Sequence, residues 1–218
     1  MINIVLPTGK LLEDSMILLE QAGLKGLCQW AGTRKLRITF AEQAISVLFV
    51  RPRDIPAYVY FGAAEVGIVG KDVLWESDYA VYELIDLGFG RCELVFAVPA
   101  TSPLVGAKVW PPTLRVATKY TRAAERYFQT IGQSVELVSL HGSVELAPYA
   151  GLCDGIVDIT QTGRTLAENN LVPIAKIDYS TARLVVNQAS IRTKYNEVWQ
   201  ILDSIKAVLE SGSDDKNS

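Results

Sequence analysis

The chain has 218 residues, of which 49% are hydrophobic and 21% charged, so it can bury a full core in one or two domains. Its 21 Lys and Arg residues against 24 Asp and Glu residues give a net charge of −3, and no basic run indicates a nucleic-acid-binding protein. No apolar run approaches the ~18 residues of a membrane span. Because the first residues resemble a strand and not a signal peptide, we expect a cytoplasmic globular protein.

The few cysteines and histidines narrow the possible chemistry. Cys28, Cys92 and Cys153 are widely spaced, which suits reduced thiols and disfavours a zinc site. His141 is the single histidine, and the sequence contains no Gly-x-Ser-x-Gly motif, which disfavours a Ser-His-Asp hydrolase. We therefore interpret His141 as a structural or peripheral residue.

Short apolar strands alternate with helices in the first part of the chain. Residues 2–6 predict a strand, and residues 10–22 predict a helix because their apolar positions have nearly helical spacing. Residues 45–50 and 66–69 predict two further buried strands, each followed by a turn or helix signal. This alternation predicts an α/β protein with parallel strands.

The alternation continues to the end of the chain. We expect a strand at 93–98, a strand, helix and strand at 115–118, 122–131 and 135–140, a strand at 183–186, and an amphipathic helix at 194–209. Pro, Gly and Ser are frequent near 97–114, where we place a crossover between two lobes. The predicted lobes are 1–96 plus 180–218, and 97–179, and the polar residues 211–218 predict a frayed tail.

The most informative segment begins at Asp154 and contains a β-branched strand. The turn after this strand holds small hydrogen-bond donors and one glycine: Thr160, Gln161, Thr162, Gly163 and Thr165. Backbone N–H groups at such a turn into a helix can surround a phosphate without a lysine, and Asp154 and Asp158 suit ribose hydroxyls. The segment therefore predicts a ribose-phosphate site, although Thr165 and Glu168 also match a capping box, which occurs in many α/β proteins without a ligand.

Other predicted strand ends also carry polar residues, at the edge where open α/β sheets place their ligands. Gly9 and Lys10 begin the first helix and could face an anion, although such a turn is also compatible with a structural role. Arg51 follows a buried strand, and its forked guanidinium matches pyrophosphate, whereas the alternative is a solvated Arg–Asp pair with Asp54.

Two further turns give weaker signals. Asp72 follows a glycine-rich approach and a short buried strand, which by itself is little evidence for a site. Glu145 follows Ser143, a plausible helix cap, so its carboxylate could simply favour the helix dipole.

Taken in order, these blocks resemble the ATP phosphoribosyltransferase family, the first enzymes of histidine biosynthesis. The segment from Asp158 to Thr165 has the Asp-x-x-x-Thr-Gly-x-Thr spacing of a phosphoribosyl pyrophosphate loop. Leu6-Pro-Thr-Gly-Lys10-Leu is similar to the family's Leu-Pro-Lys-Gly-Arg-Leu opening, with Thr8 and Lys10 at two changed positions. Further similar blocks begin at Thr33, Arg51, Val66, Leu94, Arg115, Gly142 and Asp154.

The resemblance implies a two-lobed α/β fold of the periplasmic-binding-protein type, with a hinged cleft between the lobes and the phosphoribosyl pyrophosphate loop in the second lobe. It implies attack of adenine N1 of ATP on the anomeric carbon of phosphoribosyl pyrophosphate, with release of pyrophosphate. Mg²⁺ is expected with the substrates, bound mainly through their phosphates, and no protein ligand of the metal is named. A pyrophosphate leaving group needs charge neutralisation more than proton transfer, so a histidine base is not required.

The resemblance also implies roles for individual residues. The 5-phosphate would be bound by Thr160–Thr165 and the ribose hydroxyls by Asp154 and Asp158. The cations expected to hold polyphosphate and support catalysis are Arg51, Lys10 and Arg34. Substrate-binding residues of lesser weight would be Gly9, Asp72 and Glu145.

A chain of this length resembles the short form of the family, which lacks the histidine-binding regulatory domain. The resemblance then implies a regulatory partner similar to histidyl-tRNA synthetase, in a hetero-oligomer. Two rival functions remain open from the residues alone. A two-lobed binding or sensor module would share the architecture without the chemistry, and another phosphoribosyltransferase would keep the ribose-phosphate loop with a different nucleophile.

Overall fold

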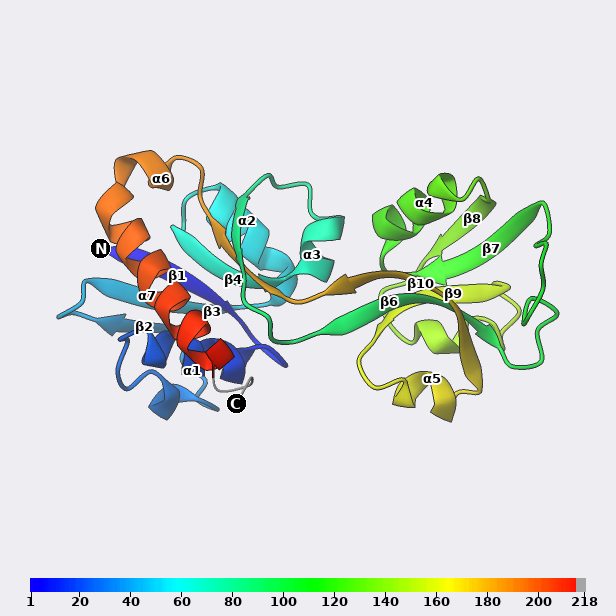
Figure 1. Cartoon of the computed structure of the whole chain (residues 1–218), viewed down its shortest axis with the longest axis horizontal. Coiled ribbons are helices and arrows are strands. Elements are labelled where there is room, and N and C mark those ends of the chain that lie inside the picture. The colour runs from blue at the N-terminus through cyan, green and yellow to red at the C-terminus, as the bar shows by residue number, and fades with distance from the viewer. Residues whose placement is uncertain (215–218) are drawn as a thin grey trace. The chain divides into compact units, whose positions relative to one another are not determined.

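The computed structural model describes residues 1–214, which form two compact units (Figure 1). Unit 1 consists of Met1–Gly90 and the chain from Thr181 onward, and unit 2 consists of Arg91–Ser180. The expected crossover at 97–114 is wrong. This segment lies inside unit 2, where it joins two strands of one sheet, because residues 92–99 are already part of that sheet.

Unit 1 contains a six-stranded sheet in the order β2-β3-β1-β4-β11-β5. Its strands are β1 (Ile2–Pro7), β2 (Arg37–Phe40), β3 (Ile45–Val50), β4 (Val66–Gly70), β5 (Tyr82–Asp86) and β11 (Ala182–Val186). β1 runs parallel to β3 and β4, whereas β2 pairs antiparallel with β3, and β11 pairs antiparallel with β4 and β5. The sheet is therefore mixed, with parallel strands as expected but antiparallel ones as well, because a short turn joins β2 to β3 and leaves no room for a crossover helix.

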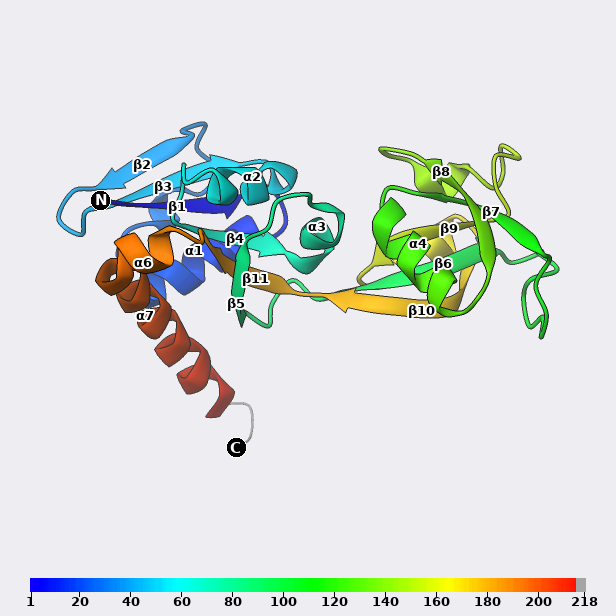
Figure 2. The ribbon, with the colours of Figure 1, turned by 90° about the horizontal axis from the view of Figure 1, so that it is seen from above.

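Helices cover both faces of this sheet (Figure 2). They are α1 (Leu12–Gln21), α2 (Ile55–Tyr60), α3 (Lys71–Glu76), α6 (Ser190–Thr193) and α7 (Tyr195–Asp214). Successive side chains of β1 point to opposite faces, so Ile4 and Leu6 pack with α1 and α7 while Val5 packs with α2. α7 continues through residues 211–214, which were expected to fray, and the rest of that expected tail, 215–218, lies outside the described residues.

Unit 2 contains a five-stranded sheet in the order β10-β6-β9-β7-β8. Its elements are β6 (Cys92–Pro99), β7 (Thr113–Thr118), α4 (Thr121–Thr130), β8 (Ser134–Ser139), β9 (Gly155–Thr160), α5 (Arg164–Glu168) and β10 (Leu171–Ser180). β7, β8 and β9 are parallel, and β6 pairs antiparallel with β9 and β10. The sequence did not predict β10, an irregular edge strand that contains Pro173 and two register shifts.

The core of unit 2 also occupies both faces of its sheet. Val95, Ala97, Ile156 and Leu166 belong to one buried cluster. Phe96 points to the other face, where its ring lies 5.3 Å from that of Phe128 on α4. Among the described residues, no helix has the length and apolar character needed to cross a membrane.

Candidate active site

The carboxyl ends of three parallel strands in unit 2 bring charged side chains together. Lys119 directly follows β7, Glu145 lies in the 3-10 turn Val144–Leu146 after β8, and Asp158 lies near the end of β9. The Lys119 Nζ atom is 3.4 Å from Asp158 Oδ1. Glu145 is close enough to raise the pKa of Asp158. The sheet topology therefore assembles one cation and two carboxylates from distant parts of the sequence.

Burial is the main influence on Asp158. Desolvation raises the pKa of its carboxyl group, and the charge of Glu145 adds to this rise. Lys119 and the backbone N–H of Ile159, which donates to Oδ1 over 2.8 Å, act in the opposite direction. Within residues 1–214, the hydrogen bond from Ile159 and the ion pair with Lys119 both use Oδ1 of this carboxylate, so Oδ2 can accept a bond from a ligand.

The turn after β9 is held by its own hydroxyl groups. The N–H of Gly163 donates to Thr160 Oγ1 over 2.9 Å, and the N–H of Arg164 donates to Thr162 Oγ1 over 3.4 Å. Gly163 has a φ of 75°, a left-handed conformation that favours glycine. The N–H groups of Gly163 and Arg164 are therefore directed at oxygen acceptors within the turn itself.

A pocket of about 690 Å³ adjoins this turn. Four of the predicted phosphate-binding residues line it: Thr160, Gln161, Thr162 and Gly163. Thr165 is exposed on the first turn of α5. The capping-box alternative is wrong, because α5 begins at Arg164 with Gly163 as its N-cap, and Glu168 instead pairs with Arg164 at 2.7 Å.

Asp154 does not belong to this group of residues. It lies just before β9, so it is separated from Asp158 by the ~13 Å that four residues of a strand span. Its Oδ2 accepts a hydrogen bond from the N–H of Arg115 over 2.7 Å, which ties the start of β9 to β7. The structure therefore does not bring Asp154 together with Asp158, because an extended strand places its two ends far apart.

Lys119 was not among the residues predicted for the site. Thr118 fixes the turn that carries it, because Thr118 Oγ1 donates to Val157 O over 2.6 Å and accepts from the N–H of Tyr120 over 2.8 Å. The available signal was the Thr-Lys-Tyr sequence at the end of a predicted strand.

The capping role expected for Ser143 is also wrong, because this residue has a φ of 48° and makes no side-chain cap bond to the short turn that carries Glu145.

Unit 1 gathers its predicted residues at the carboxyl ends of β1, β3 and β4. Pro7 is in register with Val50, and the N–H of Thr8 donates to Val50 O over 2.8 Å. The turn after β1 therefore lies beside the turn after β3. The predicted residues at this edge are Gly9 and Lys10 after β1, Arg51 after β3, Asp72 in the first turn of α3, and Arg34 just before β2.

Three of these residues are exposed cations: Lys10, Arg34 and Arg51. The alternative role of Arg51, an ion pair with Asp54, is not seen within residues 1–214. Instead, the backbone N–H of Asp54 donates a hydrogen bond to the carbonyl oxygen of Arg51 over 2.9 Å. Gly9 has a φ of 94°, which turns the chain between β1 and α1. Asp72 folds back over Gly70, where an added Cβ would collide with the Asp72 carboxylate. His141 is exposed, which agrees with a peripheral role.

Comparison with known proteins identifies the family. The family model described as "HisG: ATP phosphoribosyltransferase" matches residues 51–207. The ATP phosphoribosyltransferase of Moorella thermoacetica is 43% identical over 98% of this chain and 96% of its own length. The enzyme of the same name from Caldanaerobacter subterraneus subsp. tengcongensis is 43% identical over 97% of this chain and 99% of its own length. This chain belongs to the ATP phosphoribosyltransferase family.

ATP phosphoribosyltransferases are pentosyltransferases that form phosphoribosyl-ATP from ATP and phosphoribosyl pyrophosphate, the first step of histidine biosynthesis. A solved structure entitled "ATP phosphoribosyl transferase (HisG:HisZ) complex from Thermotoga maritima" matches with a TM-score of 0.80 and 34% identity, over 97% of this chain and 100% of that one. The substrate-binding protein of an amino acid ABC transporter matches with a TM-score of 0.55 and 13% identity, over 99% of this chain and 96% of that one. The fold is therefore the two-lobed periplasmic-binding-protein type.

Proposed function

We propose that this phosphoribosyltransferase binds the phosphoribosyl group through unit 2, at Asp158 and the turn Thr160–Thr165. The observation that supports the proposal most is the position of a partly buried carboxylate beside a turn whose N–H groups donate to hydroxyl oxygens. The N–H groups and hydroxyls of the turn would hold the 5-phosphate. Asp158 Oδ2 would accept a hydrogen bond from a ribose hydroxyl, which fixes the sugar ring relative to its phosphate.

The nearby Lys119 would orient this carboxylate. Its 3.4 Å contact with Oδ1 and the N–H of Ile159 on the same atom leave Asp158 few alternative positions. The ammonium also opposes the rise in the pKa of Asp158 that burial and Glu145 cause, and so favours the charged acceptor. Glu145 would form part of the wall of the same site. Lys119 is thus a positioning residue for the sugar.

Unit 1 would bind polyphosphate through Arg51, Lys10 and Arg34. The reaction breaks the bond between the anomeric carbon and pyrophosphate as adenine N1 forms a bond to that carbon, so negative charge develops on the leaving group. Fixed cations stabilise such charge without a proton transfer. The exposed guanidiniums can also form paired hydrogen bonds with phosphate oxygens. Gly9 and Asp72 flank these cations at the same sheet edge and would line the site.

Magnesium would accompany the substrates. Within residues 1–214, no group of three or more His, Cys, Asp or Glu side chains is arranged to hold a metal ion. The Mg²⁺ ion would receive most of its ligands from substrate phosphates and water, as magnesium often does. When bound, the ion would neutralise charge on pyrophosphate, and the cations of unit 1 would provide the remaining neutralisation.

The proposal extends to location and regulation. The chain spans 96–99% of the two relatives described above, and the structure from Thermotoga maritima is entitled as a complex with HisZ. We propose that this chain is a cytoplasmic short-form subunit whose histidine response resides in a partner similar to histidyl-tRNA synthetase. The two units described here would be its two catalytic lobes.

A direct assay tests this function. The purified chain is mixed with ATP, Mg²⁺ and phosphoribosyl pyrophosphate, with and without the partner protein, and phosphoribosyl-ATP is followed by its absorbance. We expect product that requires both substrates, and controls that omit each substrate in turn should stay silent. Absence of product both with and without the partner would contradict the proposal. Product with free adenine in place of ATP would indicate the salvage-type alternative.

A further inference from the structure

Thr118, the last residue of β7, holds together the edge of the unit 2 sheet that carries the charged residues. It is fully buried, with 0% of its surface exposed. Thr118 and Val157 form the last residue pair between β7 and β9, and there Thr118 Oγ1 donates a hydrogen bond to Val157 O over 2.6 Å. A side chain therefore joins the two strands at the point where their ladder ends.

Two further hydrogen bonds connect Thr118 to its surroundings. Its Oγ1 accepts a bond from the N–H of Tyr120 over 2.8 Å, and its carbonyl oxygen accepts one from the N–H of Leu140 over 3.0 Å. Leu140 directly follows β8, which ends at Ser139. One buried residue thus connects the ends of β7, β8 and β9, the three parallel strands whose ends carry the charged groups.

Lys119 lies between the two residues that share the bond to this hydroxyl group. Its Nζ atom is 3.4 Å from Asp158 Oδ1 and 5.0 Å from the centre of the Tyr120 ring. A lysine side chain has many rotamers, and holding it in one of them costs conformational entropy. Because the bond from the N–H of Tyr120 to Thr118 fixes the backbone on both sides of Lys119, fewer positions remain open to its ammonium group.

The same hydroxyl group fixes Asp158 from the other side. Asp158 follows Val157 in β9, so the bond to Val157 O holds the backbone next to the carboxylate. The Asp158 side chain is 20% exposed, whereas Thr118 is fully buried, so a substrate can reach the carboxylate but not the hydroxyl. Any effect of Thr118 on the reaction must therefore be transmitted through Lys119 and Asp158.

A purely structural role for Thr118 is the alternative. Buried hydroxyl groups are nearly always hydrogen-bonded, and Thr is common in strands, so burial and two bonds do not by themselves indicate a function. That alternative does not explain why each partner of the hydroxyl, Val157 and Tyr120, directly adjoins a charged residue of the site. The two roles also predict different kinetics, because a loss of folded protein affects both substrates alike.

We propose that Thr118 is a positioning residue for the phosphoribosyl group, because its hydroxyl sets the position of the Lys119 ammonium relative to the Asp158 carboxylate. This role rests on the proposed binding of a ribose hydroxyl by Asp158. Loss of the Thr118 hydroxyl leaves the carboxylate in place but less ordered, so the sugar is held less often in a productive orientation. Binding of ATP through the cations of unit 1 does not depend on this hydroxyl.

Removal of the hydroxyl tests the proposal in the assay described above. Thr118→Ala removes it without adding atoms, Thr118→Val keeps the β-branched shape, and Thr118→Ser keeps the hydroxyl. Each hydrogen bond of this kind corresponds to a factor of about two to ten, so kcat/KM for phosphoribosyl pyrophosphate should fall about tenfold in the Ala and Val variants. The KM for ATP should change by less than about twofold, and the Ser variant should stay within about threefold of the parent.

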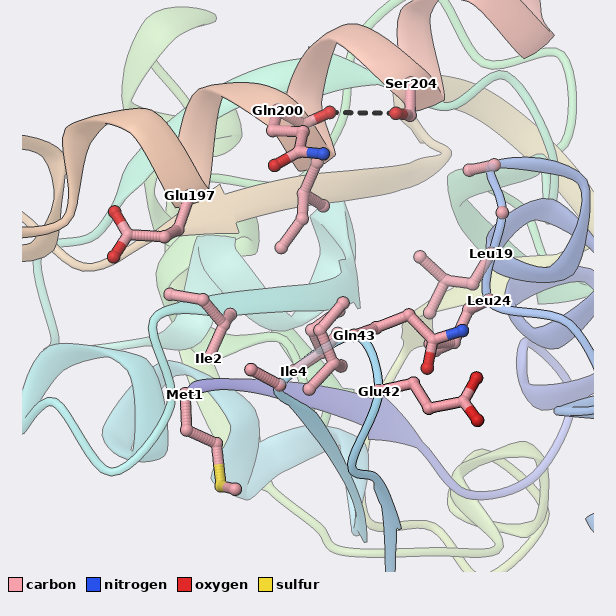
Figure 3. Close-up of a pocket in the computed structure, with 15 residues that line it drawn as sticks. Met1, Ile2, Ile4, Leu19, Leu24, Glu42, Gln43, Glu197, Gln200 and Ser204 are labelled. Carbon is pink, nitrogen blue, oxygen red and sulfur yellow. Dashed lines mark hydrogen bonds between the residues drawn. The ribbon is translucent and has the colours of Figure 1, made fainter.

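Two serines whose hydroxyls also donate hydrogen bonds serve as controls. Ser190 is buried on α6 and donates to Asn187 Oδ1 over 3.0 Å. Ser204 on α7 donates to the backbone oxygen of Gln200 over 2.9 Å, beside a pocket of about 570 Å³ in unit 1 (Figure 3). Thermal unfolding measures the stability of every variant. Ser190→Ala and Ser204→Ala each lose a hydrogen bond, but both should keep the kinetics of the parent because they lie outside unit 2.

A double variant tests whether Thr118 acts through Lys119. Residues that act as a unit have non-additive effects, so Thr118→Ala should lower kcat/KM for phosphoribosyl pyrophosphate by only about threefold or less when Lys119→Met is already present. An equal loss in the parent and in the Lys119→Met background would overturn the proposed coupling.

Parent-like kinetics in a folded Ala or Val variant of Thr118 would overturn the proposal, as would equal changes for the two substrates. Loss of the fold in both variants would also overturn it, because the hydroxyl would then be structural. Asp158→Asn separates this result from the proposed function. If Asp158→Asn is impaired and the Thr118 variants are not, only the role of Thr118 is refuted, whereas parent-like kinetics in Asp158→Asn would refute the proposed ribose site itself.

Discussion

Replacement of Asp158 by Asn separates the substrate role of this carboxylate from its role in stability. The change keeps the size of the side chain and removes the charged acceptor, Oδ2, that we assign to a ribose hydroxyl. A hydrogen bond to a charged group contributes roughly 1.5–3 kcal/mol, so kcat/KM for phosphoribosyl pyrophosphate should fall by about ten- to a hundredfold. The KM for ATP should change much less.

The stability of the same variant should not fall. Burial raises the pKa of Asp158 in the folded protein above its value of ~3.9 in the unfolded chain. The stabilisation that results is fully present below pH ~3.9 and is lost as the pH rises through the pKa of the folded protein. At pH 7 the parent therefore carries a partly desolvated charge that Asn avoids. The contact with Lys119 that is lost joins side chains that are 28% and 20% exposed, and its loss should cost little.

The assay combines initial rates with thermal unfolding at pH 7 and near pH 4. We expect a Tm at pH 7 equal to or above that of the parent, with any gain vanishing at the lower pH. Asp178→Asn is the matched control, because Asp178 also accepts the N–H of the next residue over 2.8 Å but is exposed. Unchanged kinetics for both substrates in the folded Asp158 variant would refute the ribose assignment. A fall in Tm of several degrees would show that Asp158 is mainly structural.

Three further outcomes are expected. Arg51→Ala should lower turnover at least tenfold and change the free energy of unfolding by no more than about half a kcal/mol. Arg192 is an exposed cation on α6, and Arg192→Ala should affect neither quantity. Normal turnover of the Arg51 variant would remove Arg51 from the site. Gly163 and Gly132 have φ values of 75° and 69°, and an added Cβ would meet open space at both positions. Replacement of either glycine by Ala should therefore lower the free energy of unfolding by about 1–2 kcal/mol. Only Gly163→Ala should also raise the KM for phosphoribosyl pyrophosphate. Equal kinetics in the two glycine variants would argue against the phosphate turn. Histidine should give no heat of binding in calorimetric titration of the isolated chain, and tight binding without a partner would overturn the short-form proposal.

Local sequence was sufficient for much of the fold and the family. Buried strands such as β3 and β4 are short, apolar and β-branched, and their turn signals lie next to them in the chain. The turn that we propose as the ribose-phosphate site could be located in the sequence for the same reason, because its hydroxyls and its left-handed glycine are contiguous residues. The family resemblance also depends on local blocks in a fixed order, and comparison with known proteins confirmed it.

Strand pairing required the tertiary structure. β10 is an irregular edge strand with Pro173, so it lacks the alternation that marks a half-buried strand, and the parallel sheets expected from alternating elements are in fact mixed. The 97–114 segment has the composition of a linker, yet it connects two strands of one sheet, because Pro and Gly mark any loop and carry no information about which strands it joins.

The residues of the proposed site likewise depend partly on local sequence and partly on strand pairing. Asp154 and Asp158 are close in sequence, but the extended backbone of β9 carries them to opposite ends of a strand, and only Asp158 reaches the phosphate turn. Lys119 and Glu145 come to Asp158 from separate strands because β7, β8 and β9 are parallel and end at one edge. Sequence alone thus located the local turns that we propose as anion sites, whereas the pairing of strands, which depends on contacts between distant residues, decided which charged side chains meet there.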